Sequence, residues 1–384
     1  MLQGKMVKKP VGLGPFTLKS LKENTFIFLV KNEHFFGKGK IISGRELGPY
    51  IDGVIFKLYE TLSNATLALK NRQIDFLWKG VSQAFVEDLI RDPNIIVPMT
   101  LDSGYRYLAF NLRRIPMSDP SFRRAVAYLI DKDFITKQIL HDHGQRIDTF
   151  VPPLNTFYYN ANTPVYGRGM DRKARTQKAY SILTAAGYIW KTPPLDANGS
   201  LEKGLGLTMP DGKPIPSLTL KTPSAEYDTE IAATGQLIQE WLRNFGIPVS
   251  WETMAFDGLV QKVRNSRDFD MFLLGWRNLS FDPDYLRRFF HSSYDRPNAW
   301  NYTGYINAEF DLMADLQAKT LVPEERKKIV MRLQAQLMDD LPYVPLYVPH
   351  RMEGVRIDRL SGWVSQVGGV GNIWSFCLLR PGGN

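Results

Sequence analysis

Alternating apolar and polar residues predict a regular succession of strands and helices, most clearly between Ser217 and Trp276. There, SLTLKT, IPVSWETM and FDMFLLGW are typical of strands, and they are separated by an amphipathic helix ended by Gly246 and by a shorter helix. This β-α-β-α-β order predicts a mostly parallel sheet. Ligands of such sheets lie beyond the carboxyl ends of the strands, and Trp276 stands at one of these ends.

The N-terminal part of the chain predicts a β-meander followed by a helix. The strand-like runs FTLKSL and TFIFLVKN frame Glu23-Asn24, which we interpret as a two-residue hairpin turn. IDGVIFKLY is a further strand, and SNATLALKNRQIDF is a helix with Ser63 or Asn64 as its cap. This region is therefore expected to be a β-then-α unit.

Between these two regions, GYRYLAFNL predicts an aromatic strand, and the helix after it has Asp119 as its cap and Pro120 near its first position. Residues 149–169 and 193–216 show no period and predict long loops. Near the C-terminus, two helical segments precede LPYVPLYVPH, whose prolines favour an extended strand that crosses between domains.

Length and composition narrow the class of protein. A chain of 384 residues exceeds what one hydrophobic core usually serves, so we expect two lobes. With 44% hydrophobic and 23% charged residues the chain is typical of globular proteins, and no apolar run is long enough to predict a membrane span. The formal charge of +9 comes from scattered basic residues, which do not predict nucleic-acid binding; a solvated exterior, an anionic membrane face or an acidic ligand suits it equally.

The single cysteine, Cys377, excludes an intrachain disulfide and a multi-cysteine metal site, and we expect it to pack in a core. The first residues lack the apolar run that a secretory signal requires. The expectation is therefore either a cytosolic protein or a chain whose beginning is missing.

The segment FDPDYL raises the question of catalysis. Asp282 and Asp284 are two residues apart, so on an extended segment they share one face and are poorly placed to flank a sugar ring. A metal site needs further ligands, and only His291 and Asp295 follow. No zincin, serine-hydrolase, Walker or dinucleotide motif is present, so we expect no catalytic residue, no metal and no cofactor. The simplest role for the two aspartates is to cap a helix that starts near Tyr285.

Aromatic residues carry more information, because 17 Tyr, 8 Trp and 22 Phe supply many rings suited to line a cleft. A group of them falls near predicted strand ends and loops: Tyr105, Tyr107, Trp276, Trp300, Tyr302 and Tyr305. Each alone is more often a core residue than a ligand contact. Because they gather beside the carboxyl edge of the sheet, Trp276 and Tyr302 are the strongest candidates.

Several long motifs occur in a characteristic order: VGLGPFTL, FKLYETLSNATLALKNRQIDF, YLAFNLRRIPMSDPSFRRAVAYLIDKDFI, FDMFLLGW with DPDYL, and NYTGYINAEFDLMADLQ. In these motifs the chain resembles the family 5 extracellular solute-binding proteins of ABC importers, the class that binds oligopeptides, dipeptides and nickel. The first motif has Leu13 where the family has threonine. The second has Arg72-Gln73 in place of a small residue.

This resemblance implies an α/β fold of the periplasmic-binding-protein type (type II, venus-flytrap), with two lobes, mixed sheets and flanking helices. Residues 1–110 would be the remainder of lobe I, residues 111–343 would form lobe II, and residues 344–384 would return to lobe I. Strands near 108–112 and 343–348 would cross between the lobes and permit hinge closure.

The resemblance also implies that the protein binds a small solute in an interlobe cleft and delivers it to the membrane subunits of an ABC permease. The solute would be an oligopeptide, a modified peptide or a sugar-like molecule. We expect a monomer without enzymatic activity, periplasmic or extracellular, and associated with the membrane in its full-length form. Two alternatives remain: a chaperone or receptor that uses the same fold, and a hydrolase.

Two departures from the family pattern matter. Family members carry a signal peptide and a sizeable region before the first motif, and the chain lacks both, so we expect an incomplete lobe I in a fragment or the product of a split gene. In peptide binders an aspartate shortly after the Gly-Trp pair holds the α-amino group of the ligand, and Leu279 stands at that place, so ordinary recognition of a peptide's amino end is not expected. The expected ligand contacts are Trp276, Tyr302, Asn301, Arg277, Asn278 and Tyr105.

Overall fold

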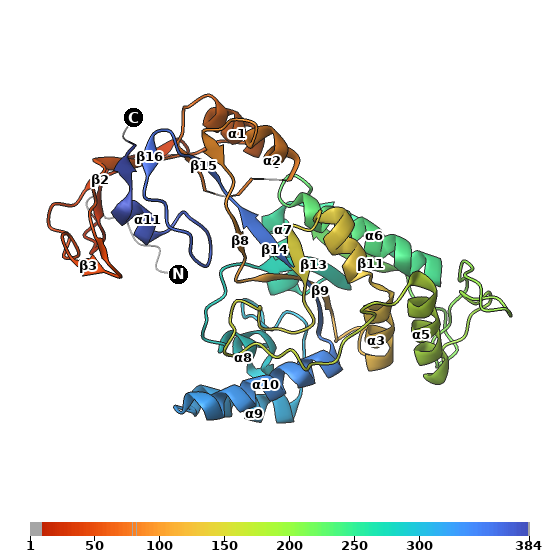
Figure 1. Ribbon diagram of the computed structural model, residues 1–384. Coiled ribbons are helices and arrows are strands. Elements are labelled where there is room, and N and C mark those ends of the chain that lie inside the picture. Colours follow the sequence, from red (N-terminus) through yellow and green to blue (C-terminus); the bar gives the residue numbers. More distant parts are fainter. Residues whose placement is uncertain (1–9, 79, 82, 383–384) are drawn as a thin grey trace. The chain divides into compact units, whose positions relative to one another are not determined.

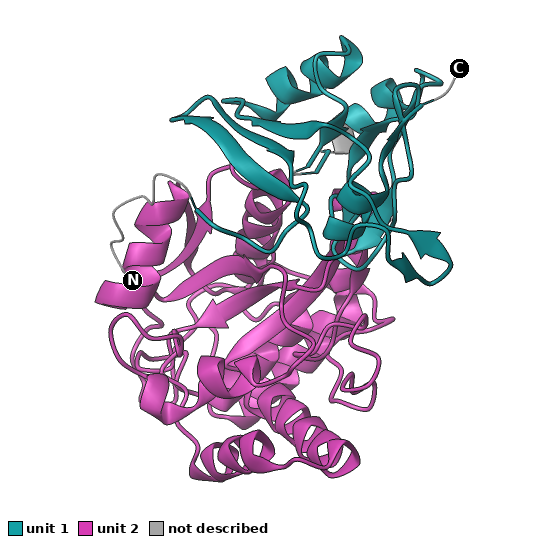
Figure 2. Cartoon of the chain, turned by 90° about the vertical axis from the view of Figure 1, so that its left-hand side faces the viewer, with its two compact units in different colours: residues 1–101, 350–384 teal, residues 102–349 magenta. Residues whose placement is uncertain are grey.

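The computed structural model describes residues 10–78, 80–81 and 83–382, and the chain divides into two compact units (Figure 2). Unit 1 comprises residues 1–101 and 350–384, and unit 2 comprises residues 102–349. Residues 1–9, on which part of the expectation about a secretory signal rests, lie outside the described residues. The boundaries expected at 110/111 and 343/344 fall inside unit 2, because the two strands expected to cross between lobes pair with each other in the sheet of that unit.

Unit 1 is built from small antiparallel sheets. Strands β1 (Phe16–Lys22), β2 (Phe26–Lys31) and β5 (Gly53–Lys57) form one sheet in the order β1-β2-β5. The shorter strands pair as β3 with β4, as β6-β15-β7, as β8 with the end of β14 (Tyr343–Met352), and as β16 with β17. Their bounds are β3 (Ile41–Ile42), β4 (Arg45–Glu46), β6 (Phe76–Leu77), β7 (Ile95–Ile96), β8 (Met99–Leu101), β15 (Gly354–Arg356), β16 (Leu360–Ser361) and β17 (Arg380–Pro381).

The core of unit 1 lies between α1 (Leu62–Lys70), α2 (Gln83–Leu89) and the β6-β15-β7 sheet. Helix α11 (Ile373–Leu378) carries Cys377, which is buried as expected. The buried apolar residues of this core include Ala65, Leu69, Leu77, Val81, Val86, Leu89, Ile95 and Met352.

Unit 2 is organised around one mixed sheet in the order β10-β14-β9-β13-β11-β12 (Figure 1). Strand β11 pairs in parallel with both β12 and β13, whereas β9 pairs antiparallel with β13 and β14. The predicted β-α-β-α-β order is thus confirmed. The remaining strand bounds are β9 (Tyr105–Phe110), β10 (Gly144–Arg146), β11 (Leu218–Pro223), β12 (Val249–Met254) and β13 (Met271–Trp276).

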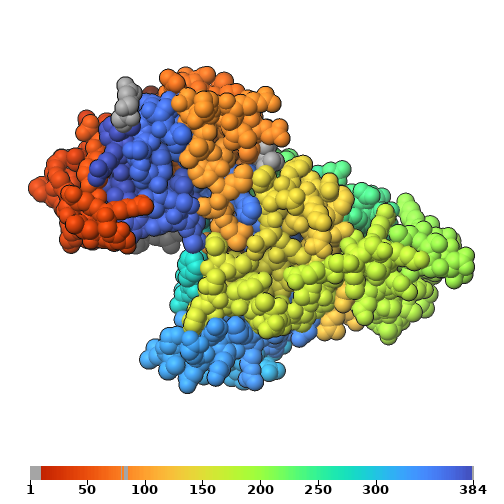
Figure 3. Space-filling model, viewed as in Figure 1, coloured from red at the N-terminus to blue at the C-terminus, as the bar shows by residue number. Residues whose placement is uncertain are grey.

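Helices cover the sheet of unit 2 on its two sides. Figure 1 shows α6 and α7 on one side of the strands and α8, α9 and α10 on the other. The helical bounds are α3 (Pro120–Leu129), α4 (Lys132–Phe134), α5 (Arg172–Ala185), α6 (Thr229–Phe245), α7 (Phe256–Val260), α8 (Tyr285–Phe290), α9 (Ala308–Lys319) and α10 (Pro323–Asp340), with π-helical turns η1 (Ile135–Ile139) and η2 (Gln261–Ser266) and the 3-10 turn η3 (Ser292–Tyr294). The loops between β10 and β11, yellow to green in Figure 3, spread over the surface of this unit.

Local signals set most of these boundaries. Asp119 caps α3 as predicted, because its side chain accepts a hydrogen bond from the Ser121 amide at 2.8 Å. The hairpin between β1 and β2 is confirmed, but its loop has one residue more than predicted, with Asn24 at a φ of 53°. The cap of α1 is Thr61 and not Ser63 or Asn64, since the Thr61 hydroxyl accepts from the Asn64 amide.

Candidate functional site

Three parallel strands of unit 2 end at the same edge of the sheet. Strand β11 ends at Pro223, β12 at Met254 and β13 at Trp276. Strand β9 runs in the opposite direction, so its first residues pair with the last residues of β13. The loops that leave this edge carry a group of charged and aromatic side chains. It is the edge at which open α/β sheets bind ligands.

A buried carboxylate lies at the centre of this group. Asp228 caps α6, because one of its oxygens accepts from the Ile231 amide at 3.1 Å. Its second oxygen accepts from Nη2 of Arg277 at 3.1 Å and is ion-paired with Nη2 of Arg106 at 3.3 Å. The side chains of Asp228 and Arg106 are only 4% and 8% exposed, whereas that of Arg277 is 49% exposed. Arg277 therefore reaches from the buried carboxylate out to solvent.

The two acidic groups at the start of α6 have opposite pKa shifts. Burial alone would raise the pKa of Asp228, but Arg106, the Ile231 amide and Arg277 together lower it below its ordinary value. Burial and the neighbouring charge of Asp228 raise the pKa of Glu230. Of these two groups, Asp228 therefore carries the negative charge, and its two oxygens are already engaged.

A glycine makes room for the buried arginine. Arg106 on β9 lies opposite Gly275 on β13, and a Cβ at Gly275 would meet Nη1 of Arg106 at 2.7 Å. The guanidinium of Arg106 therefore rests on the backbone of β13, from where its other nitrogen reaches Asp228. In the Gly-Trp-Arg sequence at the end of β13, the glycine thus leaves room for Arg106, and the arginine is Arg277.

An aromatic pair lies beside Arg277. Tyr227 and Phe256 stack with ring centroids 4.4 Å apart and an interplanar angle of 9°. Tyr227 follows β11 and is 46% exposed, while Phe256 follows β12. The guanidinium carbon of Arg277 is 6.0 Å from the centroid of Tyr227. We call Arg106, Tyr227, Asp228, Phe256 and Arg277 the edge cluster.

The chemistry of the edge cluster suits binding. The half-exposed guanidinium of Arg277 presents N–H groups in a planar fork, and the Tyr227 ring offers a flat apolar surface beside it. Asp228 is poorly suited as a general base, because both of its oxygens already accept from neighbouring groups and its pKa is lowered.

Trp276 follows Gly275 in β13, and successive side chains of a strand point to opposite faces. Its ring therefore lies on the face of the sheet opposite to Arg106. Its ring is stacked on Phe289 of α8 with centroids 3.9 Å apart, and Tyr107 and Tyr302 lie at 5.8 Å and 5.7 Å. The ring is partly buried, and its indole nitrogen has no hydrogen-bond partner among the residues that the structure describes. Trp276 is thus part of an aromatic stack that joins the sheet to α8.

The other predicted contacts have different surroundings. Asn301 is buried and holds its loop together, since its side chain donates to the carbonyl of Tyr305 and accepts from the amide of Gly304. Tyr302 is 7% exposed, and burial raises its pKa to about 12. Tyr105 is fully buried and contacts Tyr107 and Phe150.

Asn278 is exposed and adopts a left-handed conformation with a φ of 52°, which asparagine tolerates well. Of the six predicted contacts, Arg277 alone belongs to the edge cluster. Trp276, Tyr302 and Tyr105 lie together on the other face of the sheet, where rings link them through Tyr107. As ligand contacts, all six remain predictions.

The two aspartates of the FDPDYL segment hold an elbow, but the helix-capping prediction was wrong. Asp284 stands at the N-cap position of α8, which begins at Tyr285, but its side chain makes no capping bond. Its carboxylate instead accepts from Arg287 at 2.8 Å and from Gln317 at 3.0 Å. Asp282 accepts from the Asp284 amide at 2.9 Å and from Arg326 at 2.6 Å. Both carboxylates are therefore engaged in fixing α8 against α9 and α10.

The sequence analysis missed four members of the edge cluster. Tyr227 and Asp228 stand in the loop before α6, where an aspartate is expected to be only a cap, and Phe256 is the first residue of α7. Arg106 lies within β9, where both of its sequence neighbours are tyrosines. Their shared position could have indicated this site. Three of the four lie next to the carboxyl ends of predicted parallel strands, and Arg106 lies at the start of a strand that pairs beside them.

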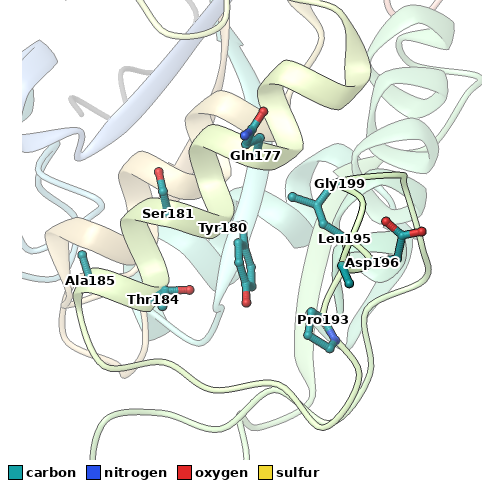
Figure 4. Close-up of a pocket in the computed structure, with 10 residues that line it drawn as sticks. Gln177, Tyr180, Ser181, Thr184, Ala185, Pro193, Leu195, Asp196 and Gly199 are labelled. Atoms are coloured by element: carbon teal, nitrogen blue, oxygen red, sulfur yellow. The ribbon is translucent and has the colours of Figure 1, made fainter.

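Unit 2 also has a shallow depression away from this edge. It has a volume of about 780 Å³ and lies between α5 and the loop of residues 193–199. In Figure 4, Tyr180 projects from α5 toward this loop. The charged residue of its lining is the loop's Asp196, whose carboxylate accepts the amides of Asn198 and Ser200. This depression has none of the convergent charged groups of the edge cluster.

A metal site and a membrane-spanning helix are two further features that would bear on function. Within residues 10–78, 80–81 and 83–382, no three His, Cys, Asp or Glu side chains are grouped so that they could hold a metal ion. Over the same part of the chain, no helix is both long and apolar enough to cross a membrane.

Comparison with known proteins places these features in a context. The family model for bacterial extracellular solute-binding proteins, family 5 Middle, matches residues 3–298. The oligopeptide-binding protein AppA of Bacillus subtilis is 29% identical over 347 residues, which is 89% of this chain and 57% of AppA. The peptide transport periplasmic protein SapA of Salmonella typhimurium is 24% identical over 91% of this chain and 56% of its own length. The chain thus spans somewhat more than half the length of these relatives.

Solved structures agree. The structure of AppA from Bacillus subtilis in complex with a nonapeptide has a TM-score of 0.72 and 26% identity, over 94% of this chain and 66% of that one. NikZ from Campylobacter jejuni in complex with Ni(L-His) has a TM-score of 0.74 and 24% identity, over 95% of this chain and 67% of that one. The second likeness shows the fold alone.

Proposed function

Because the chain belongs to the family 5 bacterial extracellular solute-binding proteins, we propose that it acts as the solute-binding component of an ABC importer for a peptide-like solute. The solute binds outside the cytoplasmic membrane and passes to the membrane subunits of a permease. The relatives support this proposal, since AppA is named for oligopeptide binding and was solved with a nonapeptide. The enclosure of the solute between two lobes stays a prediction.

The observation that carries the proposal is the edge cluster. It combines a half-exposed guanidinium with a half-exposed ring at the carboxyl edge of the sheet in unit 2. Ligand sites commonly pair a flat apolar surface with a few fixed polar groups, and buried Asp228 fixes Arg277. We infer that a peptide backbone or side chain lies on Tyr227 while its polar groups meet Arg277.

Thermal unfolding of the 384-residue chain tests this proposal. A pool of random tri- to nonapeptides is added, because a ligand that binds only the native state raises the unfolding temperature. At a peptide concentration one hundred times its Kd, the native state gains about 2.7 kcal/mol. A raised unfolding temperature that disappears when peptides are replaced by free amino acids supports peptide binding, and an unchanged temperature with every pool contradicts it.

A further inference from the structure

We infer that the solute meets the edge cluster through an oxyanion, most simply a carboxylate, and not through an ammonium group. The inference rests on the proposed function and names the chemistry of the solute at this one place. It follows from three features of the cluster: the direction in which Arg277 is held, the kind of polar atom left unpaired, and the nature of the neighbouring acidic groups.

Arg277 is held by one nitrogen and leaves the others available. Among the described residues, Arg277 donates a hydrogen bond from Nη2 to Asp228 at 3.1 Å. The side chain is 49% exposed, so the remaining N–H groups face a region that a solute can enter. A guanidinium fork matches the two oxygens of a carboxylate, and such charge-assisted pairs are among the stronger hydrogen bonds in proteins.

A buried donor of the edge cluster is left without a partner. Nη1 of Arg106 has no hydrogen-bond partner within the described part of the chain, and a guanidinium nitrogen can only donate. Arg106 is 6% exposed, and Tyr347 pairs opposite it on β14. Asp228, by contrast, has both oxygens engaged. A solute group that accepts hydrogen bonds therefore complements the two guanidinium groups, whereas an ammonium would bring further donors to them.

Three further carboxyl groups lie near the cluster. Burial and Asp228 raise the pKa of Glu230, which favours its neutral form. Asp102 interacts electrostatically with Arg106 and accepts from the Gly104 amide at 3.0 Å. Asp257 in the first turn of α7 is exposed and lies close enough to Tyr227 to influence it electrostatically. Of these three groups, Asp257 is the exposed carboxylate that could bind a cationic group, and a test must separate it from Arg277.

Two matched peptide pools provide that test, both made of uncharged residues and of three to nine residues in length. The acid pool has acetylated amino ends and free carboxyl ends, and the amide pool has free amino ends and amidated carboxyl ends. Binding of each pool to the 384-residue chain is followed by calorimetry. A charge-assisted bond contributes roughly 1.5–3 kcal/mol, so we expect the acid pool to bind about tenfold to a hundredfold more tightly.

Variants assign the preference to a residue. Arg277→Gln should abolish the preference for the acid pool, and Arg277→Lys should retain part of it because a lysine keeps the charge but not the fork. Arg288→Gln is the matched control, since Arg288 is 62% exposed and lies on α8, outside the edge cluster. If an Arg277 variant fails to fold, the comparison of the two pools on the wild-type chain still decides.

Each outcome has one meaning. Tighter binding of the acid pool that depends on Arg277 supports the inference. Equal binding of both pools overturns it while the proposed function stands. Tighter binding of the amide pool that is lost in Asp257→Asn also overturns it and identifies a cation site instead. No binding by either pool contradicts the proposed function itself and removes the inference with it.

Discussion

Trp276 is the last residue of β13 and Arg277 follows it, and comparing the surroundings of their side chains on the two sides of the sheet shows how one strand end serves two purposes. On one face, Trp276 is stacked on Phe289 and surrounded by further rings, so its contacts are with its own chain. On the other face, Arg277 is held by a buried carboxylate and is half exposed. The tryptophan face stabilises the fold, and the arginine face keeps unused hydrogen-bonding capacity.

The comparison predicts its largest effect for Trp276→Ala. Removing a large, stacked aromatic side chain costs about 3–5 kcal/mol of unfolding free energy. Trp300→Ala is the control, because Trp300 is 36% exposed and contacts the same stack at a centroid distance of 5.9 Å. Chemical denaturation should show a clearly smaller loss for Trp300→Ala. Equal losses would mean that Trp276 does not hold the stack together.

The second prediction concerns the glycine on the arginine face. In Gly275→Ala the new Cβ would meet Nη1 of Arg106 at 2.7 Å and its Cδ at 2.5 Å. Overpacking of this kind costs about 1–3 kcal/mol. Gly258→Ala on α7 is the control, because a Cβ there would meet no atom within 4 Å. Equal unfolding free energies for the two variants would show that Arg106 moves aside without cost.

The third prediction uses the pKa of Asp228, which is lowered in the folded chain. An unfolded aspartate takes up its proton near pH 3.8 while the folded one stays ionised, so the unfolded state binds more protons there. The stability that this group contributes is therefore present above about pH 4 and is lost as the pH falls further.

Between pH 5 and about pH 3, the unfolding free energy of the Asp228→Asn variant should fall less than that of the wild type. The reason is that asparagine keeps the helix cap and does not titrate. Unfolding free energies measured across that range provide the comparison. A steeper acid loss in the variant would contradict the lowered pKa. The unfolding free energy of the Trp276→Ala variant should change with pH by as much as that of the wild type. The two faces of the sheet thus differ in their response to pH.

The smallest predicted effect concerns the elbow that follows β13. Asp284→Asn removes partly exposed ion pairs with Arg287 and Arg288, which should cost about 0.2–1 kcal/mol. Because no capping bond is lost, the larger cost expected of a helix cap should be absent. A loss of about 2 kcal/mol in chemical denaturation would restore the capping interpretation.

Much of the fold could be predicted from the sequence because its signals are local. The segment from Ser217 to Trp276 carries a clear hydrophobic period and a glycine stop, and the predicted elements are present. The order of the motifs predicted the family, and the family comparison confirms it. The hairpin and the caps of α1 and α8 were wrong in detail, because neighbouring polar residues compete for the same role.

The site was harder to predict because it depends on contacts between distant segments. The roles of Arg106 and Asp228 depend on the pairing of β9 with β13, which no sequence period reveals. Aromatic residues at strand ends suggested a ligand surface, yet most of these rings contact each other. Arg277 was among the expected ligand contacts, but its partners were not predicted. Its position beside Asp228 and Tyr227 gives it a role of its own.

The most direct test of the central claim is photo-crosslinking of a peptide pool that carries benzoylphenylalanine, followed by mass spectrometry of the attachment points. If the edge cluster binds the solute, crosslinks should fall on residues 223–228, 254–257 and 277–279, and competing unlabelled peptide should remove them. Crosslinks confined to the depression between α5 and residues 193–199, or to the tryptophan face through α8, would contradict the claim.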